Sequence, residues 1–223
     1  MDLSKSYEFF QPSMCDSRIH IIGCGSVGST VAELLVRYGL TNITLYDFDH
    51  VEAHNIANQM FDSTDIGKEK VTAVADHLIA INPELQDTLR IADKGYINQK
   101  LSGYVFLCVD NIDLRRKIAE ENRNNVFIKA MFDFRTRLTD AQHYAADWSD
   151  EKHKEAFINS MQFSHEEASK ETPMSACHVT LSVAATVRLI CTYGVVNFID
   201  FLKKGTLKKT VLINTELWDL MGI

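Results

Sequence analysis

The feature that most restricts the fold of this chain is a glycine-rich turn placed between an apolar run and an amphipathic segment. Residues 18–22 are rich in β-branched side chains, residues 23–28 read GCGSVG, and residues 26–38 carry apolar side chains at helical spacing. A second β-branched run, at residues 43–46, ends at Asp47. This order of strand, turn, helix and strand predicts a right-handed βαβ unit with parallel strands.

The rest of the chain continues the alternation of strands and helices. We expect further helices at residues 71–81, 112–124, 152–161 and 179–202, and further strands at residues 88–91, 104–109, 126–132 and 211–214. From Asp147 to Pro173 the composition shifts to Glu, Lys, His and Ser, which predicts a crossover insert or lid at about residues 147–175. The sequence therefore predicts one α/β domain over residues 1–223, with a doubly wound, Rossmann-like, mostly parallel sheet covered by helices on both faces.

Composition limits the partners and the cellular compartment. A formal net charge of −7 argues against binding to DNA or RNA, whose phosphates attract an excess of Lys and Arg. The N-terminal segment has no apolar core, and we find no apolar run of the roughly 18 to 20 residues that spans a bilayer. Five scattered cysteines without a CxxC pair predict neither disulfides nor structural zinc. We expect a cytoplasmic protein that binds neither nucleic acid nor membrane.

The glycine turn predicts a nucleotide site. Backbone amides at the start of a helix, together with the helix dipole, can hold a phosphate group. Asp47 lies 19 residues after Gly28, where a carboxylate can accept hydrogen bonds from ribose hydroxyls. This arrangement suits NAD as well as ATP. Capping of the following loop by Asp47 and Asp49 is an alternative that needs no ligand.

Three further elements follow the second strand in a fixed order. Residues 47–59 read DFDHVEAHNIANQ, residues 66–70 read IGKEK, and the next helix ends in INP at residues 81–83. Later, residues 109–111 read VDN and are followed by Arg115. This series resembles the ThiF/HesA/MoeB family, the bacterial relatives of ubiquitin-activating enzymes. The resemblance is close over residues 15–135 and looser in the C-terminal helix.

The resemblance implies a reaction and a set of site residues. The reaction is ATP-dependent adenylation of the C-terminal carboxylate of a small ubiquitin-like or sulfur-carrier protein, or of a peptide, by a homodimer. Lys70 would bind the phosphates and Asp110 would hold Mg²⁺, whereas a solvated lysine and a helix N-cap are the corresponding alternatives. The implied nucleotide-binding residues are Gly23, Gly25, Ser26, Gly28, Asp47, Asp49, Asn55, Asn58, Lys70, Asp110 and Asn111.

The chain also departs from the family pattern. Asn58 stands where the family has an arginine, and no arginine precedes Arg18, so the N-terminal arginine commonly lent by a partner subunit is missing. One lost contact to developing charge costs about 3 kcal/mol in other enzymes, so two losses would make adenylation slow. Arg135 or Arg137 could compensate. The zinc-binding CxxC pairs of the family are absent as well.

One cysteine is a candidate nucleophile. Cys177 follows the polar insert, at a place where some relatives of this family form a thioester, and a helix N-terminus would lower its pKa. A small buried residue that begins a core helix is the alternative. We expect Cys24, Cys108 and Cys191 to be packing residues.

Two other functions remain open. A non-catalytic ATP-binding scaffold of the same fold is favoured by Asn58. An NAD-dependent oxidoreductase is compatible with the glycine turn and Asp47, but it gives no reason for Lys70 and Asp110.

Overall fold

A computed structural model describes residues 1–171 and 181–223 of the chain. The strands are β1 Ile19–Ile22, β2 Ile43–Tyr46, β3 Arg90–Ala92, β4 Gly103–Leu107, β5 Ile128–Thr136, β6 Asp140–Asp147, β7 Thr210–Asn214 and β8 Asp219–Gly222. The helices are α1 Ser26–Arg37, α2 Lys70–Ile81, α3 Leu85–Thr88, α4 Ile112–Glu121, α5 Glu151–Asn159, α6 His165–Glu171 and α7 Ala184–Lys204. Short 3-10 helices lie at Pro12–Met14, Ala53–Asn55 and Ser63–Asp65.

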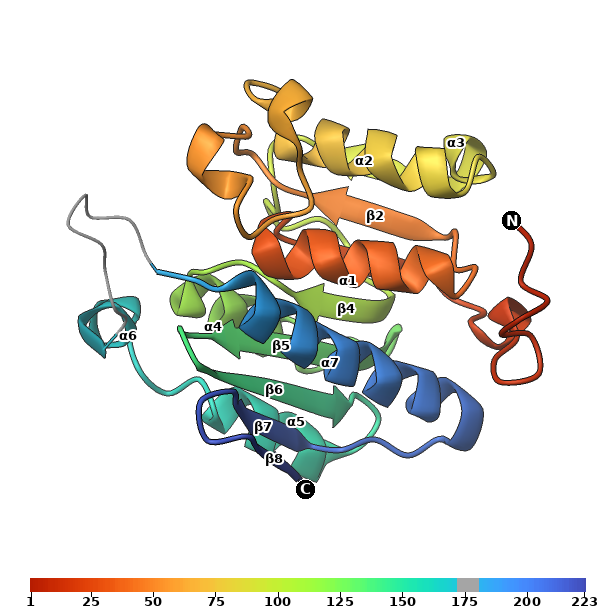
Figure 1. Cartoon of the computed structure of the whole chain (residues 1–223). Helices are drawn as coiled ribbons and strands as arrows, with labels where there is room; N and C mark the ends of the chain where they lie inside the picture. The colour runs from red at the N-terminus through yellow and green to blue at the C-terminus, as the bar shows by residue number, and fades with distance from the viewer. Residues whose placement is uncertain (172–180) are drawn as a thin grey trace.

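All eight strands form one sheet in the order β3-β2-β1-β4-β5-β6-β7-β8 (Figure 1). The strands from β3 to β5 are parallel, and those from β5 to β8 are antiparallel. The chain winds from β1 outward to β2 and β3, then returns to the other side of β1 as β4. In sheets of this kind, the usual ligand site is at the carboxyl ends of the strands on either side of such a reversal. The predicted doubly wound α/β class is confirmed.

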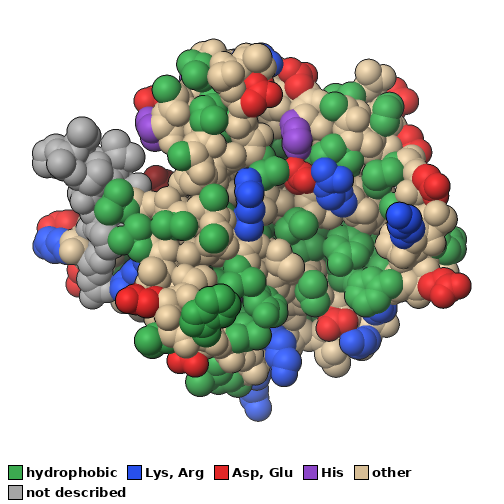
Figure 2. All heavy atoms as spheres, viewed as in Figure 1, with side chains coloured by type: hydrophobic (Ala, Val, Ile, Leu, Met, Phe, Trp, Pro, Cys, Tyr) green, Lys and Arg blue, Asp and Glu red, His purple; other side chains and the backbone are tan. Residues whose placement is uncertain are grey.

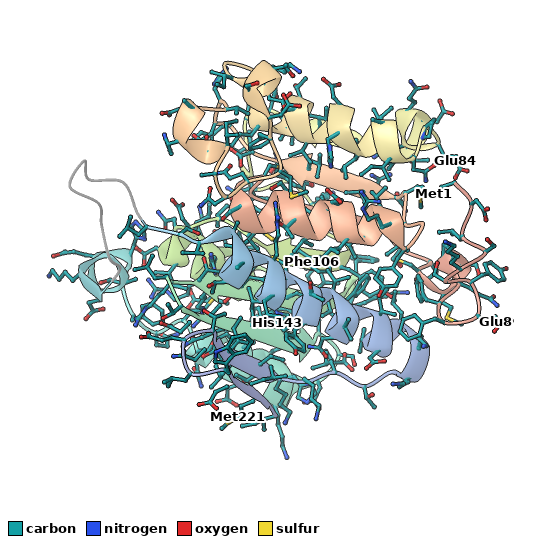
Figure 3. All side chains as sticks on the ribbon, viewed as in Figure 1. Met1, Glu8, Glu84, Phe106, His143 and Met221 are labelled. Atoms are coloured by element: carbon teal, nitrogen blue, oxygen red, sulfur yellow. The ribbon has the colours of Figure 1, made fainter. Side chains whose placement is uncertain are left out.

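Two apolar cores lie on the two faces of the sheet. Helices α1, α2 and α7 cover one face, and α4 and α5 cover the other (Figure 1). Beneath α7, the ring of Phe106 stacks on Phe132 at 4.8 Å between ring centroids and meets Phe198 edge-on at 5.2 Å. Figure 3 shows Phe106 and His143 between the sheet and this helix. Aromatic packing of this kind holds α7 firmly on the sheet.

A glycine allows α7 to approach the sheet closely. A Cβ atom added at Gly194 would lie 2.1 Å from Cε1 of Phe134 and 3.2 Å from Nδ1 of His143. Asn197, one turn further along, is buried and donates from Nδ2 to Nε2 of His143 at 3.1 Å and to the Lys208 carbonyl oxygen at 2.8 Å. The position of α7 therefore depends on the absence of a side chain at residue 194.

Judged by its length and composition alone, α7 could span a bilayer, so the expectation that no segment could do so was wrong by that test. This 21-residue helix passes that test, and half of its most apolar stretch is buried inside the protein. Its apolarity has a local cause, because α7 packs against both α1 and the sheet. Figure 2 shows apolar side chains along its outer face as well.

Several predicted boundaries were also wrong. Strand β5 begins at Ile128 rather than at residue 126, since Val126 and Phe127 lie in an exposed turn with 86% and 74% of their surface accessible. Helix α7 begins at Ala184 rather than at residue 179. Strands β6 and β8 were not predicted, and the polar insert contains α5 and α6.

Candidate functional site

The glycine turn needs its glycines for geometric reasons. Gly23 has a φ of +98°, and a Cβ atom at Gly28 would lie 1.8 Å from the Gly23 carbonyl oxygen. At Gly25 the nearest atom to an added Cβ is Oε1 of Gln59, at 3.9 Å. Gly23 and Gly28 therefore permit tight packing of the turn, whereas a Cβ atom at Gly25 would meet Gln59 only at ordinary van der Waals distance.

The start of α1 is suited to an anion. Its N-cap, Gly25, offers no side-chain acceptor, and its first turn contains no acidic residue. The first helical hydrogen bond runs from the Ser29 N–H to the Gly25 carbonyl oxygen at 3.0 Å. As at every helix N-terminus, the first amides have no helical acceptor, so those of Ser26 and its neighbours can donate to a phosphate.

Asp47 joins the end of β2 to the glycine turn. Its Oδ2 accepts from the Cys24 N–H at 2.6 Å, and its Oδ1 accepts from the Asp49 N–H at 2.9 Å. The loop-capping role expected as an alternative is therefore real. Each carboxylate oxygen keeps a second lone pair, which leaves acceptors for ribose hydroxyls.

Lys70 is not a freely solvated lysine. Its Nζ lies 2.9 Å from Oδ2 of Asp49, and its side chain is 12% exposed while that of Asp49 is 51% exposed. The Lys70 N–H also donates to the Asp49 carbonyl oxygen at 2.9 Å. The pair places a cation at the first residue of α2, where the helix dipole alone would disfavour it. An ammonium group has three donors, so the pair leaves capacity for a phosphate.

In the segment after β2, Gln59 is a candidate site residue that was not predicted from the sequence. Asn55 is buried, and its Oδ1 accepts from the Glu52 N–H at 2.9 Å, so it shapes the loop. Asn58 follows, partly buried. Next to it, Oε1 of Gln59 is buried without a hydrogen-bond partner in the described part of the chain. Gln59 is the last residue of the DFDHVEAHNIANQ segment that carries the family resemblance, and this was the signal for it in the sequence.

The loop after β4 presents Asp110 to solvent. Asn111 caps α4 by accepting the Leu114 N–H on its Oδ1 at 3.0 Å, a structural role for a residue expected to bind nucleotide. Asp110 itself is exposed. Arg115 holds this loop in place, because its Nε donates to the Val109 carbonyl oxygen at 2.6 Å and its Nη2 donates to the same oxygen.

Arg115 belongs to a buried charge cluster. Its Nη1 lies 2.7 Å from Oδ1 of Asp133, and Nε of Arg135 lies 2.7 Å from Oδ2 of the same fully buried carboxylate. Arg135 also donates to the carbonyl oxygen and the hydroxyl of Ser160 at 2.8 and 2.9 Å, and its guanidinium lies 4.3 Å from the ring centroid of Tyr144. These contacts argue against Arg135 as the replacement cation for Asn58.

The described cysteines are not reactive thiols. Burial raises the pKa of Cys24, Cys108 and Cys191 well above the usual range, as expected for packing residues. Burial also raises the pKa of Cys15 to about 11. Cys177 lies outside the described residues.

The structure contains the ligands for only part of a metal site. Within residues 1–171 and 181–223, no group of three or more His, Cys, Asp or Glu side chains is arranged to hold a metal ion. Asp110 offers one exposed carboxylate. Mg²⁺ is commonly held by one or two carboxylates, substrate phosphates and water, so this residue fits a metal that arrives with a nucleotide.

Three comparisons bear on this site. Ubiquitin-like modifier-activating enzyme 5 of Caenorhabditis elegans is 33% identical over 119 residues, which cover 46% of this chain and 28% of that protein. The Drosophila mojavensis protein of the same name is 33% identical over 143 residues, which cover 56% of this chain and 35% of its own length. The chain thus spans about a third of the curated relatives it matches.

Solved structures share the fold. Escherichia coli MccB, crystallised with MccA, superposes with a TM-score of 0.71 at 18% identity over 95% of this chain and 65% of MccB. PaaA superposes with a TM-score of 0.70 at 14% identity over the whole of this chain and 68% of that protein. The model of the ThiF family matches residues 3–219. The glycine turn, the Lys70–Asp49 pair and the exposed Asp110 thus belong to a member of the ThiF family.

Proposed function

We propose that this chain is an ATP-dependent adenylyltransferase that activates a C-terminal carboxylate. The acceptor would be a small ubiquitin-like or sulfur-carrier protein, or a peptide. Support comes from the relatives, since one group is named for activating a ubiquitin-like modifier and MccB has been crystallised with ATP and with MccA. The observation that carries the proposal is the set of groups at the carboxyl ends of the parallel strands. They are the ammonium group of Lys70, the exposed carboxylate of Asp110 and the first backbone amides of α1, which have no helical acceptor.

Each residue has a defined task in this reaction. The α1 amides and Lys70 would hold the phosphates, and Asp47 would accept the ribose hydroxyls. A carboxylate oxygen of the acceptor attacks the α-phosphorus, the bond to the β-phosphate oxygen breaks, and pyrophosphate leaves with the electron pair. Fixed cations favour this step because both reactants are anions.

Asp110 would hold Mg²⁺ when the nucleotide is bound. The metal would supply positive charge to the polyphosphate. Arg115 is a positioning residue in this scheme, since its hydrogen bonds to the Val109 carbonyl oxygen hold the loop that carries Asp110.

Three further properties extend the proposal. A homodimer and a cytoplasmic location follow the family resemblance and the composition. Transfer of the acyl group from the adenylate to Cys177, with release of AMP, would give a thioester if that residue is the nucleophile.

Asn58 supports a second candidate function. The amide carries no charge where the family has an arginine, so the protein would bind ATP without turning it over at a useful rate. Such a scaffold would use the same residues for binding and would need no acceptor.

ATP–pyrophosphate exchange separates the two candidates. Purified protein with Mg²⁺ would be assayed against small proteins ending in Gly-Gly and against short peptides, beside Asp110→Asn and Glu121→Ala. We expect exchange to fall roughly 100- to 1,000-fold in Asp110→Asn and to stay unchanged in Glu121→Ala, whose side chain lies on the exposed face of α4. ATP binding without exchange for any acceptor would favour the scaffold, and absence of ATP binding would refute both.

A further inference from the structure

A cation from the far end of the chain lies beside the segment in which the family arginine is missing. Nη2 of Arg188, on α7, donates to Sδ of Met60 at 3.7 Å. Met60 is two residues after Asn58. Residues 60 and 188 are 128 positions apart in the sequence, so only the packing of α7 reveals that they are neighbours.

The start of α7 is held against the start of α1. Sγ of Cys191 donates to the Val27 carbonyl oxygen at 3.7 Å, and Oγ1 of Thr186 donates to the Leu138 carbonyl oxygen at 2.8 Å. Figure 1 shows the N-terminal ends of the two helices side by side, next to the segment that follows β2. These contacts come two residues before and three residues after Arg188 on α7, so its Cα is well fixed.

A short series of hydrogen bonds leads from Met60 to the glycine turn. The Met60 N–H donates to Oγ of Ser29 at 3.2 Å, and that hydroxyl donates to the Gly25 carbonyl oxygen at 2.7 Å. The unpartnered Oε1 of Gln59 faces Gly25 from the same segment. Arg188 therefore contacts a segment that is hydrogen-bonded to the glycine turn at Gly25.

The guanidinium of Arg188 has no strong partner. Its hydrogen-bond acceptor is a thioether, which is a weak one, and the side chain is exposed. Within the part of the chain that the structure describes, Arg188 forms no ion pair, whereas Arg115, Arg116, Arg123 and Arg135 each pair with a carboxylate. An arginine without a carboxylate in a protein of net charge −7 is available for an anion.

We propose that Arg188 binds the phosphates of ATP and supplies the positive charge that Asn58 does not. The assignment rests on the proposed ATP site. A guanidinium on a long side chain can leave a thioether for phosphate oxygens, because charge-assisted hydrogen bonds to phosphate are stronger. In this assignment the cation reaches the phosphates from α7 instead of from position 58.

Calorimetric titration of this protein with ATP and Mg²⁺ tests this role without an acceptor protein. We expect Arg188→Ala to weaken ATP binding roughly 10- to 100-fold and Arg188→Lys to weaken it less. Adenosine, titrated as the probe without phosphates, should bind both proteins equally. Lys204→Ala, a charge deletion at the other end of α7, is the matched control and should leave ATP affinity unchanged.

A second substitution makes the test specific. In Arg188→Ala, the added change Asn58→Arg should restore most of the lost ATP affinity, because it returns the cation to the family position. Equal ATP affinity of the wild type and Arg188→Ala, or equal losses for ATP and adenosine, would overturn the role of Arg188 and leave the ATP site intact. A wild-type protein that binds no ATP would overturn the site itself.

Discussion

Two groups of charged residues in this protein differ in how completely their charges are paired. In the closed cluster, Arg115 and Arg135 share the carboxylate of Asp133, which has no exposed surface. In the open set, Lys70 pairs with a half-exposed Asp49, and Asp110 is exposed. Only the open set retains donors and acceptors for a ligand.

The contrast shows that residue type alone does not define a site. An arginine whose hydrogen bonds are already satisfied inside the protein gains little from a phosphate, because binding would require it to leave a buried carboxylate. Charges that are partly paired at the surface can change partners at low cost. Changes in the closed cluster should therefore affect stability, and changes in the open set should affect binding.

The largest expected effect is in the closed cluster. Asp133→Ala would leave the buried guanidinium of Arg115 and the partly buried one of Arg135 without their carboxylate, and we expect a loss of about 3 to 5 kcal/mol in the free energy of unfolding. Urea denaturation measures this loss. Glu121→Ala, which removes an exposed partner of Lys117, is the control and should cost less than about 1 kcal/mol. A similarly small loss of unfolding free energy in both variants would contradict the distinction between the closed cluster and the open set.

The next effect concerns a buried histidine beside the closed cluster. Burial lowers the pKa of His143 to about 4, and its Nδ1–H donates to the Asp133 carbonyl oxygen at 3.0 Å while its Nε2 accepts from Asn197. The unfolded chain binds the proton more tightly, with a pKa of about 6.5. Stability is therefore complete above that pH and is lost as the pH falls towards 4, by up to about 3 kcal/mol.

His143→Gln removes this titration. Urea denaturation at pH 7 and pH 4.5 should show a smaller loss of stability in the variant than in the wild type. Equal losses in the two proteins would mean that His143 does not titrate between those values.

A substitution in the open set should separate binding from stability. Lys70→Met removes the ammonium group and leaves Asp49 accessible to water, so the free energy of unfolding should change by less than about 1 kcal/mol. ATP affinity should fall roughly 10- to 100-fold, as measured by calorimetry. A loss of stability larger than the loss of binding free energy would assign Lys70 to the scaffold.

The smallest expected effect is at Asn111. Its side chain caps α4, so Asn111→Ala should cost about 1 kcal/mol in unfolding free energy. Asn111→Asp keeps an N-cap acceptor and should retain the stability. If Asn111 acts only as a cap, ATP affinity will stay within about twofold of the wild type in both variants, which calorimetry can establish.

Local patterns predicted the first half of the fold well. The predictions of the glycine turn, of Asp47 and of the Lys70 helix each rested on residues that are neighbours in the sequence. The predicted helix at residues 26–38 matches α1 within one residue. Strand β6 escaped prediction because its alanines and polar residues are poor strand formers, and pairing with β5 and β7 stabilises it. Strand β8 is short, exposed and contains Gly222.

The site was predictable to the same extent and for the same reason. Residues that lie close together in the sequence, such as those of the glycine turn, have the predicted place between a strand and a helix. By contrast, Arg135 is held by hydrogen bonds to Ser160, which is distant in the sequence, and the location of Arg188 depends on the packing of α7 against α1. Contacts between distant segments leave no periodicity to detect.

Gly194 gives the core a means of controlling nucleotide affinity from a distance. Any side chain at this position would collide with Phe134 and push α7 away from the sheet. Arg188 lies six residues earlier on the same rigid helix and would be displaced with it. A single added methyl group, in contact with neither ATP nor its acceptor, would then weaken nucleotide binding. Random mutagenesis screened for weak ATP binding should therefore recover substitutions at residue 194 together with those at the site.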